Sequence, residues 1–103
     1  MSASDYLADV QRYDFHATAD HVQMIVRHLA IVVHRDAALV ACDDPAELRR
    51  VRDSWCIKKL GAEEQACDAA IEKVCKLMAR DRTKQRVTFY YLVAKALGKL
   101  PAL

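Results

Sequence analysis

The sequence has 103 residues, of which 53% are hydrophobic and 29% are charged, and its formal net charge is +2. This balance supplies enough apolar surface for one core, so it argues against a disordered chain and predicts a single domain over residues 1–103. No run approaches the roughly 20 apolar residues of a membrane span, and the first residues lack the basic-then-apolar order of a signal peptide. We therefore expect a cytoplasmic protein.

The spacing of apolar residues predicts two helices in the first third of the chain, over residues 4–13 and 19–34. The apolar stripe of the first consists of Tyr6, Leu7, Val10 and Tyr13. The stripe of the second consists of Val22, Ile25, Val26, Leu29, Val32 and Val33. These β-branched residues also suit a strand, but the length and period of the segment favour a helix. We expect it to be the central helix of the domain.

The third predicted helix, over residues 45–60, has a well-marked start. Asp44 is expected to cap it, and Pro45 occupies the first helical position, where its missing N–H costs nothing. Glu47 would complete a capping box with Asp44. Just before this start, residues 39–40 are expected to form a short buried turn.

The last two predicted helices span residues 63–79 and 84–97. The first of them has acidic residues in its first turn and basic residues towards its end, the order that the helix dipole favours. Thr83 or Asp81 would cap the second. Five predicted helices and no convincing strand indicate an all-α domain with no sheet.

The two glycines of the chain, Gly61 and Gly98, each follow a predicted helix and are expected to end it. Because the sequence contains no other glycine, it cannot form a glycine-rich loop that wraps a phosphate. This excludes P-loop nucleotide-binding proteins and the dinucleotide-binding fingerprint.

The four cysteines, Cys42, Cys56, Cys67 and Cys75, contain no pair at C-x-x-C spacing. The pattern therefore indicates neither a zinc knuckle nor a redox dithiol. We expect small buried thiols, with a reactive thiol at Cys42 or Cys75 as the alternative. The histidines also lack the spacing of a metal-binding helix face, and no catalytic constellation is present. We expect no metal, no cofactor and no enzymatic activity.

Charge is divided between the two parts of the chain. Residues 1–44 carry three Arg and seven Asp, which gives −4, whereas residues 45–103 carry thirteen Lys and Arg against seven Asp and Glu, which gives +6. This asymmetry indicates either an external anionic partner for the basic part or packing of the two parts against each other. We favour internal packing, because charged runs are usually solvated or paired within the chain.

The segment RDRTKQR carries the candidate contact residues Arg80, Arg82, Lys84 and Arg86. The last two fall in the first turn of a predicted helix, where the dipole disfavours each cation by about 0.3–1 kcal/mol. A carboxylate of this chain should offset that cost, and the candidates are Asp5, Asp9, Asp14 and Asp43. A bound phosphate or similar anion is the alternative, with Arg49, Arg50 and Arg52 as further contacts.

Three aromatic residues follow this basic segment, Phe89, Tyr90 and Tyr91. Consecutive residues of a helix point about 100° apart, so these rings cannot form one stacking platform for bases. We expect them to belong to the core of a nearly surrounded helix, with the tyrosine hydroxyls reaching polar groups at its edge.

Three stretches, DYLADVQRY, LVACDDPAELRRVRD and DRTKQRVTFYYLVAKALGKL, resemble in this order a family of small bacterial proteins that is catalogued as a domain of unknown function. The resemblance extends over nearly the whole chain. It implies a small all-helical fold, and it brings no activity and no catalytic residues with it.

We thus expect a small soluble helical protein, a non-enzymatic protein-interaction module that binds a protein partner or a second copy of itself. An apolar face beyond the needs of the core would form the contact. Its candidate residues are Trp55, Ile57, Leu100 and Leu103. The alternative is anion or nucleic-acid binding through residues 80–86, against which the small net charge counts. No membrane partner is expected.

Overall fold

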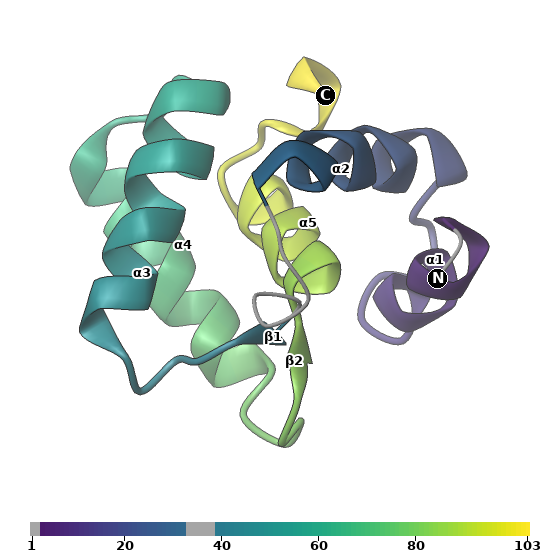
Figure 1. Ribbon diagram of the computed structural model, residues 1–103, viewed down its shortest axis with the longest axis horizontal. Helices are drawn as coiled ribbons and strands as arrows, with labels where there is room; N and C mark the ends of the chain where they lie inside the picture. Colours follow the sequence, from purple (N-terminus) through teal and green to yellow (C-terminus); the bar gives the residue numbers. More distant parts are fainter. Residues whose placement is uncertain (1–2, 33–38) are drawn as a thin grey trace.

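The computed structural model describes residues 3–32 and 39–103, and it is mostly helical (Figure 1). Its α-helices are α1 (Ala3–Gln11), α2 (Ala19–Val32), α3 (Pro45–Val51), α4 (Glu64–Leu77) and α5 (Arg86–Ala96). α3 continues directly into a π-helical segment, η2 (Arg52–Lys59), and a short 3-10 turn, η3 (Leu100–Ala102), follows α5. No helix in the described ranges is long and apolar enough to cross a membrane.

The predicted helices agree with the observed ones to within two residues at most ends. The second predicted helix matches α2 up to Val32, and its last residues, 33–34, lie outside the described part of the chain. Gly61 and Gly98 have φ angles of 70° and 68°. In this left-handed region a residue with a Cβ is strained, so both glycines end helices as predicted.

The prediction of a domain with no sheet is wrong at one place. β1 (Leu39–Val40) and β2 (Lys84–Gln85) form a two-stranded antiparallel sheet. Its register places Leu39 opposite Gln85 and Val40 opposite Lys84. Residues 39–40 therefore form a strand in place of the expected turn, and the last helix begins two residues later than expected because β2 precedes it. A strand of two residues is too short for alternation to show in the sequence.

The central helix is α5, whereas the sequence pattern favoured residues 19–34 for that place. α5 packs against α1, α2, α4, β1, η2 and η3, and Figure 1 shows it between α1 and α2 on one side and α3 and α4 on the other. All residues from 86 to 94 are buried. A helix covered all round has no single apolar stripe, which is why the stripe of α2 is the more conspicuous signal.

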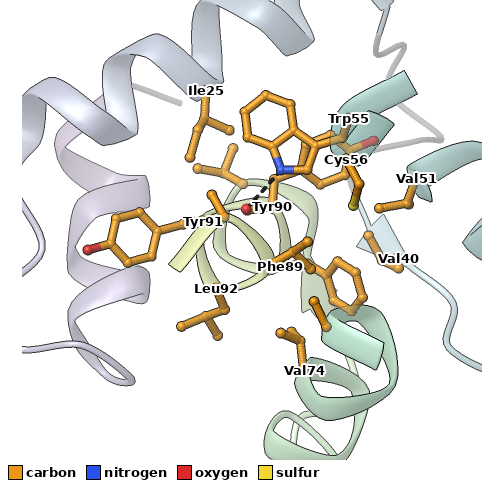
Figure 2. Packing of buried hydrophobic residues seen from close by; sticks show 14 of the residues in the cluster. Ile25, Val40, Val51, Trp55, Cys56, Val74, Phe89, Tyr90, Tyr91 and Leu92 are labelled. Carbon is orange, nitrogen blue, oxygen red and sulfur yellow. Dashed lines mark hydrogen bonds between the residues drawn. The ribbon is translucent and has the colours of Figure 1, made fainter. Parts of the chain in front are cut away.

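Trp55 lies in the middle of the core, so its prediction as an exposed contact residue is wrong. Its side chain is fully buried, and its indole Nε1 donates a hydrogen bond of 3.0 Å to the carbonyl oxygen of Tyr90 (Figure 2). The Trp55 ring lies 4.9 Å from the Tyr90 ring and 5.0 Å from that of His28. Burial of this large ring is favourable because its one polar group has a partner.

The other residues of the predicted contact face occupy mixed environments. Ile57 is 37% exposed. Leu100 and Leu103 are half-buried and pack against the core. The predicted face therefore does not exist as one exposed apolar surface.

Candidate functional site

The four cations of the basic segment lie in different environments. Arg86 is 7% exposed, and Lys84 is half-buried in β2. The Nζ of Lys84 donates a hydrogen bond of 2.8 Å to the backbone carbonyl of Asp81. Arg80 and Arg82 are exposed and have no hydrogen bond or ion pair to any residue in the described ranges. The structure thus divides the predicted contact surface into a buried part and an exposed part.

Arg86 connects three elements of the fold. Its guanidinium forms an ion pair with Glu47 of α3, donates a hydrogen bond of 3.0 Å to the carbonyl of Leu39 in β1, and lies over the ring of Tyr90. The side chains of Arg86 and Glu47 are 8% and 10% exposed. A charge buried to this degree requires its partner, so Arg86 is part of the interior and is not a contact for an external anion.

Glu47 has a different role from the predicted capping box. Asp44 caps α3 as predicted, because its carboxylate accepts hydrogen bonds from the backbone N–H groups of Ala46 and Glu47. The Glu47 carboxylate instead forms ion pairs with Arg86 and with Arg50, whose nitrogen lies 2.8 Å away. An internal carboxylate therefore offsets the cation at the start of α5, and it belongs to Glu47, which was not among the predicted aspartates.

Two of those aspartates do reach the last helix, further along it. Asp9 accepts a hydrogen bond from Thr88. Asp14 accepts one of 2.6 Å from the Tyr91 hydroxyl and lies 3.3 Å from the Nζ of Lys95. The hydrogen bond from Tyr91 lowers the pKa of Asp14, and burial raises the pKa of Tyr91. The acidic N-terminal part therefore packs on the basic C-terminal part, as the charge division favoured.

The other two predicted aspartates are Asp43 and Asp5. Asp43 forms no ion pair with a described residue, and the side chain of Asp5 lies outside the described part of the structure.

Asp81 connects the loop after α4 to the end of α1 and does not cap α5. Its carboxylate accepts hydrogen bonds from the hydroxyl of Tyr13 at 2.5 Å and from Arg12 at 2.7 Å. The bond from Tyr13 lowers the pKa of Asp81, and burial raises the pKa of Tyr13 to about 12. The residue before α5 is Gln85, which makes no side-chain capping bond, so the prediction of Thr83 or Asp81 as the cap is wrong.

An apolar groove lies where α4, α5 and the turn after α1 meet, and its volume is about 270 Å³. Its lining consists of Tyr13, Lys73, Val74, Leu77, Leu92, Lys95 and Ala96. Leu77 is 52% exposed. The lining comes from α4, from α5 and, through Tyr13, from the turn that follows α1. The sequence did not predict this groove because its residues come from three separate segments of the chain.

A second cavity, of about 540 Å³, lies beside the two-stranded sheet. It is lined by residues 39–43 and 82–84. Arg82 and Lys84 of the basic segment face it together with Asp43, so its charge is mixed.

The cysteines form two pairs with different chemistry. Cys56 and Cys67 are fully buried thiols, as predicted. Cys42 and Cys75 form a disulfide with a Cα–Cα distance of 5.9 Å, so the prediction of four thiols is wrong for this pair. These two residues are 33 positions apart, and no local spacing indicates which distant segments the fold brings together.

The fold and the candidate site together define a small helical domain with a buried central helix. Acidic residues from other segments of the chain form hydrogen bonds or ion pairs with this helix. A family model described as protein of unknown function (DUF2853) matches residues 5–101. The chain therefore belongs to this family, and the resemblance seen in the sequence is confirmed. A search of curated proteins finds no match.

Proposed function

We propose that this protein is a non-enzymatic interaction module that binds an acidic protein partner through the groove between α4, α5 and the turn after α1. The observation that carries the proposal is the exposure of Leu77, at 52%, beside the buried residues Val74 and Leu92 that line the same groove. A single exposed leucine is ordinary, but one that continues into an apolar groove offers a partner both contact area and shape.

The charges at the groove favour an acidic partner. Lys73 of α4 and Lys95 of α5 both line it, and both are exposed. Lys95 lies near Asp14, whereas Lys73 forms no ion pair with a described residue. A partner that brings a carboxylate to Lys73 and an apolar side chain to Leu77 would complement this surface.

The same charges disfavour a dimer in which two grooves face each other. A two-fold contact places the same patch on both subunits, so Lys73 and Lys95 of one copy would approach those of the other. Like charges brought together in this way oppose association. We therefore propose a different protein as the partner, and self-association is an outcome that the test below detects.

The side chains of the groove also support a role without catalysis. Its titratable groups are Tyr13, Lys73 and Lys95. The Tyr13 hydroxyl already donates to Asp81, and burial raises its pKa to about 12. This hydroxyl therefore does not act as a general base near neutral pH.

We further propose that the protein works in the cytoplasm. Cys56 and Cys67 support this location, because these two adjacent buried thiols are free, whereas the Cys42–Cys75 disulfide is the feature that favours an oxidising compartment. Adjacent cysteines are more readily kept as thiols in a reducing compartment.

Replacing Leu77 with lysine is expected to reduce capture of the partner by about tenfold or more. One apolar side chain buried at an interface contributes about 1.5–3 kcal/mol, and about 1.4 kcal/mol corresponds to a factor of ten. The measurement compares the proteins retained from a cell lysate by the immobilised wild-type and Leu77→Lys chains, and it identifies each retained species by mass.

The matched control is Ile57→Lys, which places the same charge on another exposed apolar residue outside the groove. It should retain the partner at the wild-type level. Equal losses from the two variants would contradict the groove as the contact. A wild-type chain that retains no protein and stays monomeric in light scattering at high concentration would contradict the interaction module itself.

Anion or nucleic-acid binding is the second candidate function, and the exposure of Arg80 and Arg82 favours it. Neither guanidinium has a partner among the described residues, and Arg82 also lines the cavity beside the sheet. Arg86 no longer belongs to this surface, because it is buried against Glu47.

If this second function holds, the double variant Arg80→Ala/Arg82→Ala should weaken binding of duplex DNA or RNA at low salt. The slope of log K against log salt should fall in magnitude by about 0.9 for each phosphate that the variant no longer neutralises. Fluorescence anisotropy over a salt series measures both quantities. Lys58→Ala/Lys59→Ala is the control, since it removes the same charge from two exposed residues that are not candidate contacts. Failure of DNA, RNA and nucleotides to bind the wild-type chain at low salt would exclude this function.

A further inference from the structure

The Cys42–Cys75 disulfide lies at the wall of a cavity that neither proposed function uses. Cys42 belongs to the segment between β1 and α3, and Cys75 lies in α4. Both are half-buried, so the disulfide is within reach of solvent. Both line the same cavity, which has a volume of about 250 Å³.

We propose that Cys42–Cys75 is a thiol-exchange site that reacts with a small thiol bearing a carboxylate, of the glutathione class. The bond is then a reversible link between the start of α3 and the last turns of α4. This proposal does not depend on the groove or on its partner.

The walls of the cavity suit one end of such a molecule. Leu48 and Ile71 line it beside the two sulfur atoms. Its volume of about 250 Å³ is just below the range of about 300–1,000 Å³ typical of pockets that enclose a whole small ligand. The cavity therefore admits the thiol and the groups next to it, while the rest of the molecule stays in solvent.

Arg49 provides the preference for a carboxylate. Its side chain lines the cavity, is exposed, and forms no ion pair with a described residue. The two acidic residues of the cavity are already engaged, since Asp68 lies 3.6 Å from Arg52, and Glu72 lies 3.1 Å from Lys76. Arg49 is thus the cation that lines this cavity in the described part of the chain, and a guanidinium binds a carboxylate well.

The second cysteine pair shows why exchange is confined to Cys42–Cys75. Cys56 and Cys67 are both fully buried, and burial raises the pKa of each thiol. The thiolate is the nucleophile in exchange, and it must reach its target. These two thiols therefore stay protonated and enclosed while the outer pair exchanges with solvent.

The exchange proceeds in two balanced steps. The thiolate of the small molecule forms a bond to one sulfur of the disulfide, the Cys42–Cys75 bond breaks, and the displaced sulfur leaves as a thiolate that takes a proton from water. A second small thiolate attacks the small-molecule sulfur of the mixed disulfide, so the two small molecules leave joined by a disulfide bond, and the second cysteine sulfur leaves as a thiolate that takes a proton from water. Two electrons thus pass from two small thiols to the protein, and the reverse sequence restores the bond.

The experiment incubates the folded full-length chain with mixtures of reduced and oxidised glutathione, traps free thiols with iodoacetamide, and counts the added groups by intact mass. The result expected is two added groups at high proportions of reduced glutathione, with Cys56 and Cys67 labelled only after denaturation. Peptide mapping assigns the two labels to Cys42 and Cys75. A bond that stays intact until denaturant is added, or labelling of all four cysteines at one rate, would overturn the proposal.

Two matched variants test the role of Arg49. Arg49→Ala should slow reduction by glutathione several-fold, whereas Arg50→Ala, a neighbouring exposed arginine that pairs with Glu47, should not. With 2-mercaptoethanol, which has no carboxylate, the Arg49→Ala and wild-type chains should react at equal rates. An equal rate of Arg49→Ala and wild type with glutathione, or an equal slowing with both reagents, would overturn the assignment of a carboxylate-bearing thiol.

Discussion

Replacing Arg86 with methionine is expected to lower the free energy of unfolding by about 3–5 kcal/mol, because the carboxylate of Glu47 loses its buried cation and keeps, among the described residues, only the solvent-exposed Arg50 as an ion-pair partner. Both side chains are about one-tenth exposed or less, so water does not screen the remaining charge. The variant also loses the hydrogen bond to the carbonyl of Leu39, which joins α5 to β1. Urea denaturation followed by circular dichroism measures the change.

Arg50 provides the control for this prediction, because it pairs with the same carboxylate from solvent. Its side chain is 67% exposed and its nitrogen lies 2.8 Å from Glu47. Arg50→Met should therefore cost no more than about 1 kcal/mol. The double variant Glu47→Leu/Arg86→Met should be more stable than Arg86→Met alone, since neither charge is then left unpaired. A loss below about 1 kcal/mol for Arg86→Met would contradict a buried pair.

The helices could be predicted because their signals are local. Asp44 and Pro45 mark the start of α3 within two residues, and Gly61 and Gly98 mark helix ends through their own φ angles. The covered helix α5 could also be predicted, since its run of aromatic and aliphatic residues leaves no polar face. Each of these signals depends on the effect of a residue on its own backbone or its near neighbours, so it can be identified from the sequence alone.

The pairings of the site could not be predicted in the same way, because they join residues far apart in the chain. Arg86 and Glu47 are 39 positions apart, and Thr88 and Asp9 are 79 apart. The division of charge predicted that acidic residues of the first part of the chain, residues 1–44, would contact the last helix. It could not indicate which acidic residue would pair with which donor. The short sheet and the disulfide are invisible in the sequence for the same reason, since each depends on a contact between distant segments.

The start of α5 shows how a local rule and a distant contact combine. A cation in the first turn of a helix is unfavourable, and this conflict predicts a nearby negative charge. The structure contains that charge at Glu47, a residue whose local pattern indicated a capping box. A residue that conflicts with its local position is thus a useful marker of a tertiary contact, even where its partner cannot be named.

Replacing Trp55 with alanine is the second change expected to have a large effect, a loss of about 3–5 kcal/mol in the free energy of unfolding. A domain of this length has a total stability of about 5–15 kcal/mol, so the variant would be close to unfolding. Trp55 is fully buried, and its ring packs on Tyr90 of the central helix and on His28 of α2. Its removal leaves a cavity where η2, α2 and α5 meet.

Two further variants separate the contributions of Trp55. Trp55→Phe retains most of the ring packing but lacks the N–H bond to Tyr90, so its stability should lie between those of the wild type and the alanine variant. Ile57→Ala, in the same π-helical segment but 37% exposed, should stay within about 1 kcal/mol of the wild type. Urea denaturation followed by circular dichroism is suitable for all three variants. Tryptophan fluorescence is not, because the chain contains one tryptophan and two of the variants replace it. Similar losses of stability for Trp55→Ala and Ile57→Ala would show that the core is not centred on Trp55. The two residues lie two positions apart in one segment and differ in their burial.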